Sequence, residues 1–276
     1  MEILRDKNIG IFDSGFGGLN IMRGIVRALP EYDFVYLGDT ARTPYGTRSQ
    51  ETIYEFTRQA VDFLFSKNCA LIIFACNTAS SDALRLIQQK YIPKRYPDGK
   101  ALGVLIPIAE VAVSKTSNKR IGVVATESTV SSGAFIREIS KLDPEIQVFQ
   151  NACPLLVPLI ESGEIDSEVT EMMLRKYLAS LLKQDIDTLI LGCTHYGLLE
   201  NKIKKITGES VTVISEPGIV AEKLADYLER HPEVEERLSK KNKRTFYSTD
   251  LTKKFEILGS KFFGKKLEVE KANLEQ

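Results

Sequence analysis

The sequence has no excess of charge of either sign, since 276 residues include 37 Lys and Arg and 37 Asp and Glu. A protein that coats nucleic acid needs a basic excess, so we expect neither a nucleic-acid partner nor a membrane surface. Long apolar runs are also missing: the longest uncharged run, residues 146–160, holds two prolines, whereas a spanning helix needs about 20 apolar residues. Residues 1–6 lack the apolar region of a signal peptide. These absences predict a cytoplasmic protein.

Cysteine and histidine are scarce. The four cysteines form no C-x-x-C pair, and there are only two histidines, His195 and His231. That set does not fit a structural zinc site, so we predict no bound metal. Because thiols stay reduced in the cytoplasm, each cysteine must be explained as a free thiol.

What is present is an ordinary globular composition, with 43% hydrophobic and 27% charged residues, and a length that favours two domains. Short apolar runs alternate with longer amphipathic stretches, which predicts an α/β fold with parallel sheets. The predicted strands are 8–12, 33–37, 70–75, 102–106, 120–125, 147–150, 188–191 and 211–215, with later strands at 244–248 and 266–270. The clearest predicted helices are 51–67, 167–183 and 218–230.

The chain also repeats itself weakly. Residues 63–78 align with 180–195, which places Cys76 on Cys193, and residues 7–11 align with 119–123. We interpret this as two similar α/β domains related by pseudo-symmetry, with a functional site in the cleft between them. A Pro-Asp-Gly turn at 97–99 suggests the boundary. The first domain is then residues 1–100 with the returning segment 216–276, and the second is residues 101–215.

Cys76 and Cys193 each follow a buried strand and precede a predicted helix, at the sheet edge where α/β proteins bind ligands. A helix N-terminus lowers the pKa of a thiol, because the helix dipole favours the thiolate. The alternative is that both are small buried hydrophobic residues, the usual role of free cysteine. We interpret Cys69 and Cys153 in that way, since neither lies in such a context.

Two equivalent thiols that face each other across a cleft suggest one kind of reaction. A substrate carbon between them can lose a proton to one sulfur and gain a proton from the other, which inverts a stereocentre. The α-proton of an amino acid is only weakly acidic. Such a site must therefore stabilise a carbanionic transition state with preorganised donors and excluded water.

A glycine-rich turn follows the first strand, beginning with Asp13 and Ser14. It is not a dinucleotide fingerprint, because Asn20 stands where G-x-G-x-x-G needs its third glycine. The turn can instead offer backbone N–H groups to a carboxylate, and Asp13 can orient an amino group or act beside Cys76. The alternative for Asp13 is an Asx-turn or a helix cap.

Three further features are candidates for the same site. His195, two residues after Cys193, can take or supply a proton near neutral pH. Glu161 ends an apolar run and can be either a solvated loop residue or a site acid. The loop with Pro44, Tyr45 and Gly46 follows a predicted strand, a position that often carries function.

Four motifs together resemble the glutamate racemases of the cofactor-independent aspartate/glutamate racemase superfamily, over about residues 8–227. They are Asp-Ser-Gly-Phe-Gly-Gly at 13–18, Cys-Asn-Thr-Ala-Ser at 76–80, Ala-Cys-Pro-Leu at 152–155 leading to Glu161, and Gly-Cys-Thr-His-Tyr at 192–196. They occur in the family's order.

The resemblance implies interconversion of L- and D-glutamate without pyridoxal phosphate or metal, and a homodimer. The D-glutamate would feed peptidoglycan synthesis, and hence cell wall biogenesis and cell shape. It implies that Cys76 acts on the D-enantiomer and Cys193 on the L-enantiomer, with Asp13 and Glu161 or His195 assisting. The implied substrate-binding set is Asp13, Ser14, the backbone of Pro44, Tyr45 and Gly46, Cys76, Asn77, Thr78, Thr129, Cys193, Thr194 and His195.

The chain departs from the family pattern at three loop positions. Ser128 and Gly197 stand where the family commonly has Gly and Pro, and Ser215-Glu216-Pro217 stands where it often shows Asp-Ser. No catalytic group is lost, so only loop geometry is affected. Two alternatives stay open: a racemase of aspartate or another small acidic amino acid, and a non-catalytic protein that binds an amino acid.

Overall fold

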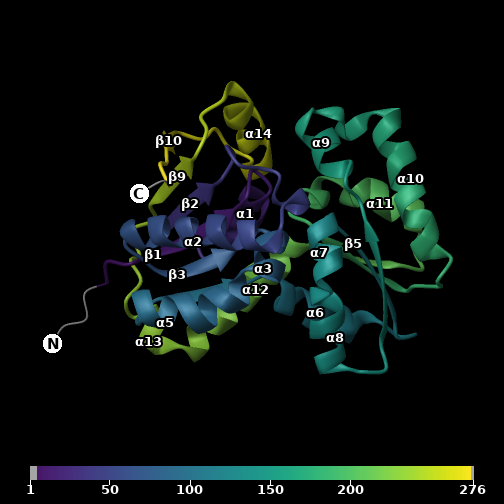
Figure 1. Cartoon of the computed structure of the whole chain (residues 1–276), viewed down its shortest axis with the longest axis horizontal. Coiled ribbons are helices and arrows are strands. Elements are labelled where there is room, and N and C mark those ends of the chain that lie inside the picture. The colour runs from purple at the N-terminus through teal and green to yellow at the C-terminus, as the bar shows by residue number, and fades with distance from the viewer. Residues whose placement is uncertain (1–4, 275–276) are drawn as a thin grey trace.

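The computed structural model describes residues 5–274 and contains two parallel β-sheets side by side, each with its own helices (Figure 1). The purple-to-blue and yellow parts of the chain form one half, and the teal part forms the other. Residues 1–4, part of the segment expected not to be a signal peptide, and residues 275–276 lie outside the described residues.

The first sheet has six strands in the order β10-β9-β2-β1-β3-β4. All of its pairings are parallel, and the last two strands of the chain extend it next to β2. The segment after residue 243 thus contributes two strands to the first sheet. The strands are β1 (Asn8–Asp13), β2 (Phe34–Gly38), β3 (Cys69–Phe74), β4 (Lys100–Gly103), β9 (Arg244–Ser248) and β10 (Val269–Lys271).

The second sheet has four parallel strands in the order β6-β5-β7-β8. These strands are β5 (Arg120–Ala125), β6 (Gln147–Ala152), β7 (Thr188–Gly192) and β8 (Thr212–Ile214). Within the first sheet, the order β2-β1-β3-β4 has the same connectivity. The pseudo-symmetry predicted from the weak repeat is confirmed, since β1 and β5 are the equivalent central strands and β3 and β7 both lead to a cysteine.

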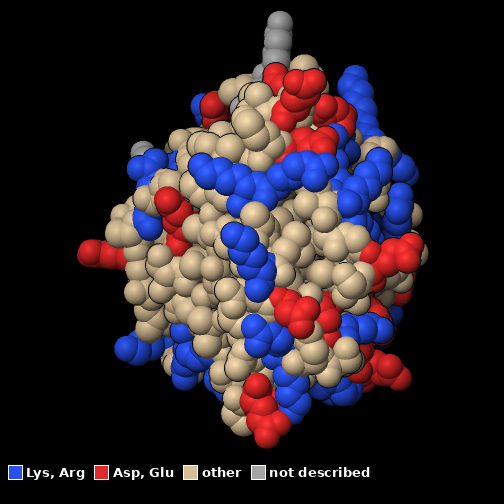
Figure 2. Space-filling view, turned by 90° about the vertical axis from the view of Figure 1, so that its right-hand side faces the viewer, with Lys and Arg blue, Asp and Glu red and all other residues tan. Residues whose placement is uncertain are grey.

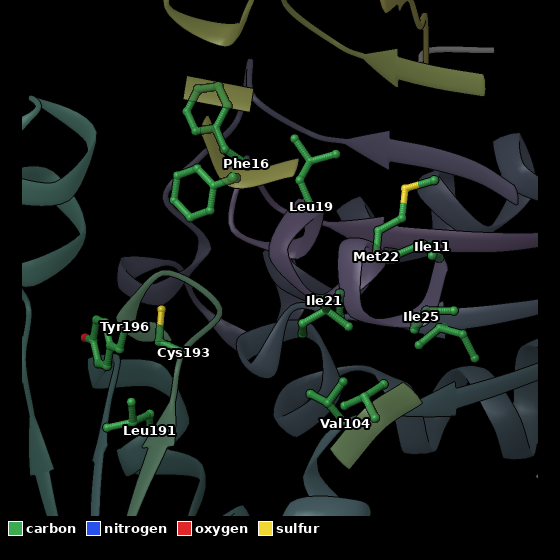
Figure 3. Close-up of a cluster of buried hydrophobic side chains, with 14 of the residues drawn as sticks. Ile11, Phe16, Leu19, Ile21, Met22, Ile25, Val104, Leu191, Cys193 and Tyr196 are labelled. Carbon is green, nitrogen blue, oxygen red and sulfur yellow. The ribbon is translucent and has the colours of Figure 1, made fainter. Parts of the chain in front are cut away.

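Both sheets are covered on both faces, which explains their continuous apolar strands. In β1, Ile9 and Ile11 pack with α1, whereas Phe12 faces α2. In the second sheet, Val124 and Ile190 likewise face opposite sides. The buried cluster around α1 continues from Phe16 and Leu19 to Leu191 and Tyr196, so the two halves share a core (Figure 3).

The helices begin where local capping allows. Ser49 accepts a hydrogen bond from the backbone of Thr52 to start α2, and Ser167 accepts one from Thr170 to start α10. The α-helices are α1 (Gly18–Ala28), α2 (Gln50–Ser66), α3 (Asn77–Asp82), α4 (Leu84–Leu86), α5 (Ile92–Arg95), α6 (Leu105–Lys115), α7 (Glu127–Ser132), α8 (Ala134–Leu142), α9 (Leu156–Glu161), α10 (Glu168–Leu182), α11 (Glu200–Thr207), α12 (Glu216–Arg230), α13 (Pro232–Glu235) and α14 (Lys253–Phe263). Short turns of other helix types are η1 (Tyr45–Thr47), η2 (Ile87–Tyr91), η3 (Glu164–Asp166) and η4 (Tyr196–Leu199).

Two predicted strands are shifted along the chain, and the one expected at 266–270 lies at Val269–Lys271. The strand expected at 102–106 lies at Lys100–Gly103 and pairs with β3 of the first sheet, and Leu105 already begins α6. The apolar run continues from the strand into the buried side of the helix, so its composition does not mark the change. The predicted boundary after residue 100 falls within β4. The points at which the chain passes between the domains therefore stay a prediction.

The surface carries charges of both signs. Figure 2 shows Lys and Arg side chains beside Asp and Glu side chains on the face that includes α10 and α11. This distribution agrees with the formal net charge of zero. Within residues 5–274, no helix has the length and apolar character needed to cross a membrane.

Candidate active site

The carboxyl ends of strands from both sheets meet at one place. Asp13 ends β1, Cys76 follows β3, and Cys193 follows β7. A hydrogen bond from Thr194 Oγ1 to Asp13 Oδ1, at 3.4 Å, joins the two edges directly. α/β proteins bind ligands at the carboxyl edge of their parallel sheets, which we call the edge rule. At this edge lie the two thiols and the carboxyl group that the sequence singled out.

Cys76 caps the N-terminus of α3. Its sulfur accepts a hydrogen bond from the backbone N–H of Ala79 and donates one to Ser14 Oγ, both at 3.4 Å. The residue is only 5% exposed. Burial, reinforced by the charge of Asp13, raises the pKa of the Cys76 thiol to about 12. The expectation that the helix N-terminus lowers this pKa is wrong, because desolvation outweighs the helix dipole.

Cys193 lies in the equivalent position of the second half and is 7% exposed. Burial holds the pKa of its thiol well above the usual range, and the negative charges of Glu216, Cys76 and Asp13 raise it further. The sulfur lies 3.9 Å from His195 Nδ1. In Figure 3 the sulfur of Cys193 points away from Leu191, toward the loop that carries Phe16. Both thiols are thus neutral groups in the protein alone.

Asp13 is fully buried, and this burial raises the pKa of its carboxyl group. The nearby charge of His195 and the backbone N–H groups of Gly15 and Gly18 act in the opposite direction. The N–H of Gly15 donates to Asp13 Oδ2 at 2.9 Å. Asp13 therefore forms the Asx-type turn considered from the sequence and also lies at the meeting point of the two halves.

His195 and Glu161 form a pair, with 3.2 Å between Nε2 and Oε1. The other ring nitrogen, Nδ1, lies 3.4 Å from Thr194 Oγ1, and the ring packs edge-on against Phe262. The sequence left Glu161 between a solvated loop and the site. The structure places it beside His195, which it can orient as an acid or a base.

Hydroxyl groups join the two halves next to Cys76. Thr78 Oγ1 lies 3.0 Å from Thr126 Oγ1 and 3.4 Å from Thr129 Oγ1. Asn77 donates from Nδ2 to Oε1 of Glu216, which begins α12. Of these residues, Thr126 and Glu216 were missed from the sequence. Both follow a strand of the second sheet, so their position at its carboxyl edge could have predicted them as site residues.

In the loop after β2, the side chains of the candidate residues do not point to the thiols. Pro44 is exposed, and the phenol of Tyr45 is turned to Asp39, to which it donates a hydrogen bond. The ring of Tyr45 packs against Phe12. Gly46 lies against Thr126, where a Cβ atom would come within 2.6 Å of the threonine Cβ. The Tyr45 side chain is therefore held by Asp39 and Phe12, and Gly46 is the residue of this loop that lies against Thr126.

We next consider groups of residues that could bind a metal ion, and a cavity near the thiols. Within residues 5–274 there is no group of three or more His, Cys, Asp and Glu side chains that could hold a metal ion. A cavity of about 530 Å³ lies between α3, α6, α8 and α12, and none of Asp13, Cys76, Cys193 and His195 lines it. The thiol site is thus separate from this cavity.

Comparison with known proteins identifies the arrangement. Residues 9–224 match the family model described as Asp/Glu/Hydantoin racemase. The chain belongs to this racemase family. It is 40% identical to the glutamate racemase of Geobacter metallireducens over 262 residues, which is 95% of this chain and 94% of the relative.

Crystal structures of racemases share the whole fold. The glutamate racemase of Francisella tularensis in complex with D-glutamate has a TM-score of 0.88 at 33% identity, covering 99% of both chains. The isoform RacE1 of Bacillus anthracis has a TM-score of 0.90 at 34% identity, covering 98% of both. The two parallel-sheet α/β domains are therefore the racemase fold.

Proposed function

We propose that this racemase interconverts L- and D-glutamate without a cofactor, by proton transfer at the α-carbon between Cys76 and Cys193. The observation that carries the proposal is the equivalent position of the two thiols, each at the end of the matching strand of one half. The glutamate racemases among its relatives, one of them in complex with D-glutamate, support glutamate as the substrate.

The proton balance is simple. With L-glutamate bound, the Cys193 thiol gives its proton to the neighbouring His195, and the resulting thiolate takes the α-proton while the Cys76 thiol gives its proton to the opposite face of the carbanionic carbon. D-glutamate then leaves a Cys193 thiol, a Cys76 thiolate and a protonated His195, and transfer of that proton through solvent to Cys76 restores two neutral thiols. Assistance comes from Asp13 on the Cys76 side, and from Glu161 or His195 on the Cys193 side.

A thiolate is costly in this buried site, because burial raises the pKa of both thiols. The ammonium group of the substrate supplies a nearby positive charge, which lowers the pKa of a thiol and offsets part of the cost. Since both thiols are nearly buried, substrate enters only when the two halves move apart, and closure then excludes water.

Polar groups around the thiols bind the substrate's ammonium group and its two carboxylates. They are hydroxyl, amide and backbone groups together with the Asp13 carboxyl group and the His195 imidazole, and they meet from both halves. The proposed set is Asp13, Ser14, the backbone of Pro44, Tyr45 and Gly46, Asn77, Thr78, Thr129, Thr194 and His195.

The cellular role follows from the resemblance. We propose a cytoplasmic homodimer that supplies D-glutamate for peptidoglycan synthesis. Exposed apolar side chains on α10 and α14, such as Met172 and Ile257, are candidates for a subunit contact. Light scattering coupled to size-exclusion chromatography is expected to give twice the chain mass of 30.9 kDa, and a monomer at micromolar concentration would contradict the dimer.

Circular dichroism of purified protein with one glutamate enantiomer, with a chelator and no pyridoxal phosphate, tests the function. We expect the signal to decay to zero from either enantiomer. Aspartate, one methylene shorter, should react about 10- to 200-fold less efficiently in kcat/KM. Faster turnover of aspartate would assign the other acidic substrate. Binding of an amino acid without decay would indicate a non-catalytic protein.

Substitution of Gly17 by Ala should disable the site while the fold persists. A Cβ atom there would overlap the Thr194 hydroxyl and lie 2.7 Å from His195 Nδ1. Displacing these groups by about 1 Å should lower kcat/KM about 100-fold. Gly218→Ala is the matched control, because its Cβ meets nothing within 4 Å. Equal activity of the two variants would show that the 194–195 loop need not be held in place.

A further inference from the structure

Glu216 is a buried carboxyl group that the proposed reaction does not use. It is the first residue of α12, directly after β8, and only 3% of it is exposed. Burial raises its pKa to about 8, so the group is largely neutral at pH 7. In that state it adds little negative charge next to Cys193 and Asp13.

Its hydrogen-bond partner is the side chain of Asn77, next to Cys76. Nδ2 of Asn77 donates to Glu216 Oε1 at 2.5 Å. The asparagine is 2% exposed, and its Oδ1 has no hydrogen-bond partner within the described part of the chain. A buried acceptor without a donor is costly, so a native structure rarely keeps one without a reason.

The carboxyl group determines which way the amide faces. The oxygen and nitrogen of an amide are nearly equal in size, so an asparagine can turn over at little steric cost. Because Nδ2 donates to Oε1 of Glu216, the N–H groups face that carboxyl group and Oδ1 is left as an acceptor without a donor. If the amide turned over, N–H groups would take that place and would repel an ammonium group.

We propose that Glu216 is a positioning residue for racemisation, which fixes Asn77 so that its Oδ1 accepts a hydrogen bond from the ammonium group of the amino-acid substrate. The inference rests on the proposed function, since it needs an amino acid between the thiols. It also gives a role to the departure at Ser215-Glu216-Pro217, where the family often shows Asp-Ser.

Steady-state kinetics of Glu216→Ala with both glutamate enantiomers test the proposal. Loss of a hydrogen bond to a charged group predicts a KM about 10- to 100-fold higher, with kcat changed less than about threefold. Glu216→Gln retains an acceptor oxygen and should stay within about threefold of wild type in KM. Glu229→Ala, at an exposed position of the same helix, is the matched control and should not change KM.

A double-variant cycle separates positioning from a general effect on the fold. Because Glu216 acts through Asn77, Glu216→Ala should raise KM no further when Asn77 is already alanine. An unchanged KM in the single variant, or an equal increase in the Asn77→Ala background, would overturn the proposal. Failure of the wild-type protein to invert glutamate would instead overturn the proposed function, so the two failures are distinguishable.

Discussion

Replacing either Cys76 or Cys193 with alanine should lower the rate of racemisation at least about 1,000-fold, because each removes one of the two groups that move the α-proton. The surviving thiol should still work on one enantiomer. Cys193→Ala should exchange the α-proton of D-glutamate for solvent deuterium without inversion, and Cys76→Ala should do the same for L-glutamate. Proton NMR measures the exchange, and circular dichroism measures the inversion.

The two other cysteines provide matched controls. Cys69 and Cys153 are equally buried thiols that lie outside the site, in β3 and after β6. Their alanine variants should racemise at wild-type rates and lose only packing. If Cys76→Ala and Cys193→Ala also inverted glutamate normally, the two-thiol mechanism would be wrong. Exchange of both enantiomers in one variant would assign both steps to a single base.

The pH dependence of stability should reveal the buried acid Glu216. Its pKa is about 8 in the folded protein and 4.5 in an exposed chain. Between these values the folded state keeps a proton that the unfolded state has released, so the free energy of unfolding falls as pH rises. The difference, 8 − 4.5 = 3.5, corresponds to about 5 kcal/mol lost in all as pH rises from well below 4.5 to well above 8.

Glu216→Gln cannot titrate and should remove this part of the pH dependence. Guanidinium unfolding at pH 5 and pH 8.5 is the measurement, and the comparison is the change in stability of each protein between the two pH values. Between these two pH values wild type should lose about 4 kcal/mol more than the variant, because part of the titration lies outside this range. Asp13, whose pKa burial also raises, contributes with the same sign in both proteins and cancels. Parallel changes would show that Glu216 is ionised in the fold.

Much of the fold could be predicted because the strands are short apolar runs between amphipathic helices. β5 and β9 lie where the sequence places them, residue for residue. β4 does not, because its apolar character continues through Leu105 into α6. Periodicity cannot locate a change from strand to helix when both are buried. The residues at which the chain crosses between the domains lie at such junctions. The domain boundaries are therefore still a prediction.

The matching positions of the two thiols at strand ends were predictable, whereas their environment was not. The edge rule and the repeat select Cys76 and Cys193 without any contact information. How deeply the thiols are buried depends on how the two halves pack, which a single sequence does not encode locally. That packing raises the pKa of both thiols, whereas their positions at helix N-termini predict a lower pKa. Glu216 was seen only as a departure from a motif, because its partner Asn77 is 139 positions away.

The most direct test of the account follows L-glutamate in D₂O by proton NMR, with wild-type protein and no added cofactor. Two thiols on opposite faces predict that the D-glutamate formed carries deuterium at the α-carbon from the first turnover. The remaining L-glutamate should keep its α-proton during early conversion. D-glutamate that retains the original α-proton, or no inversion without an added cofactor, would contradict the account.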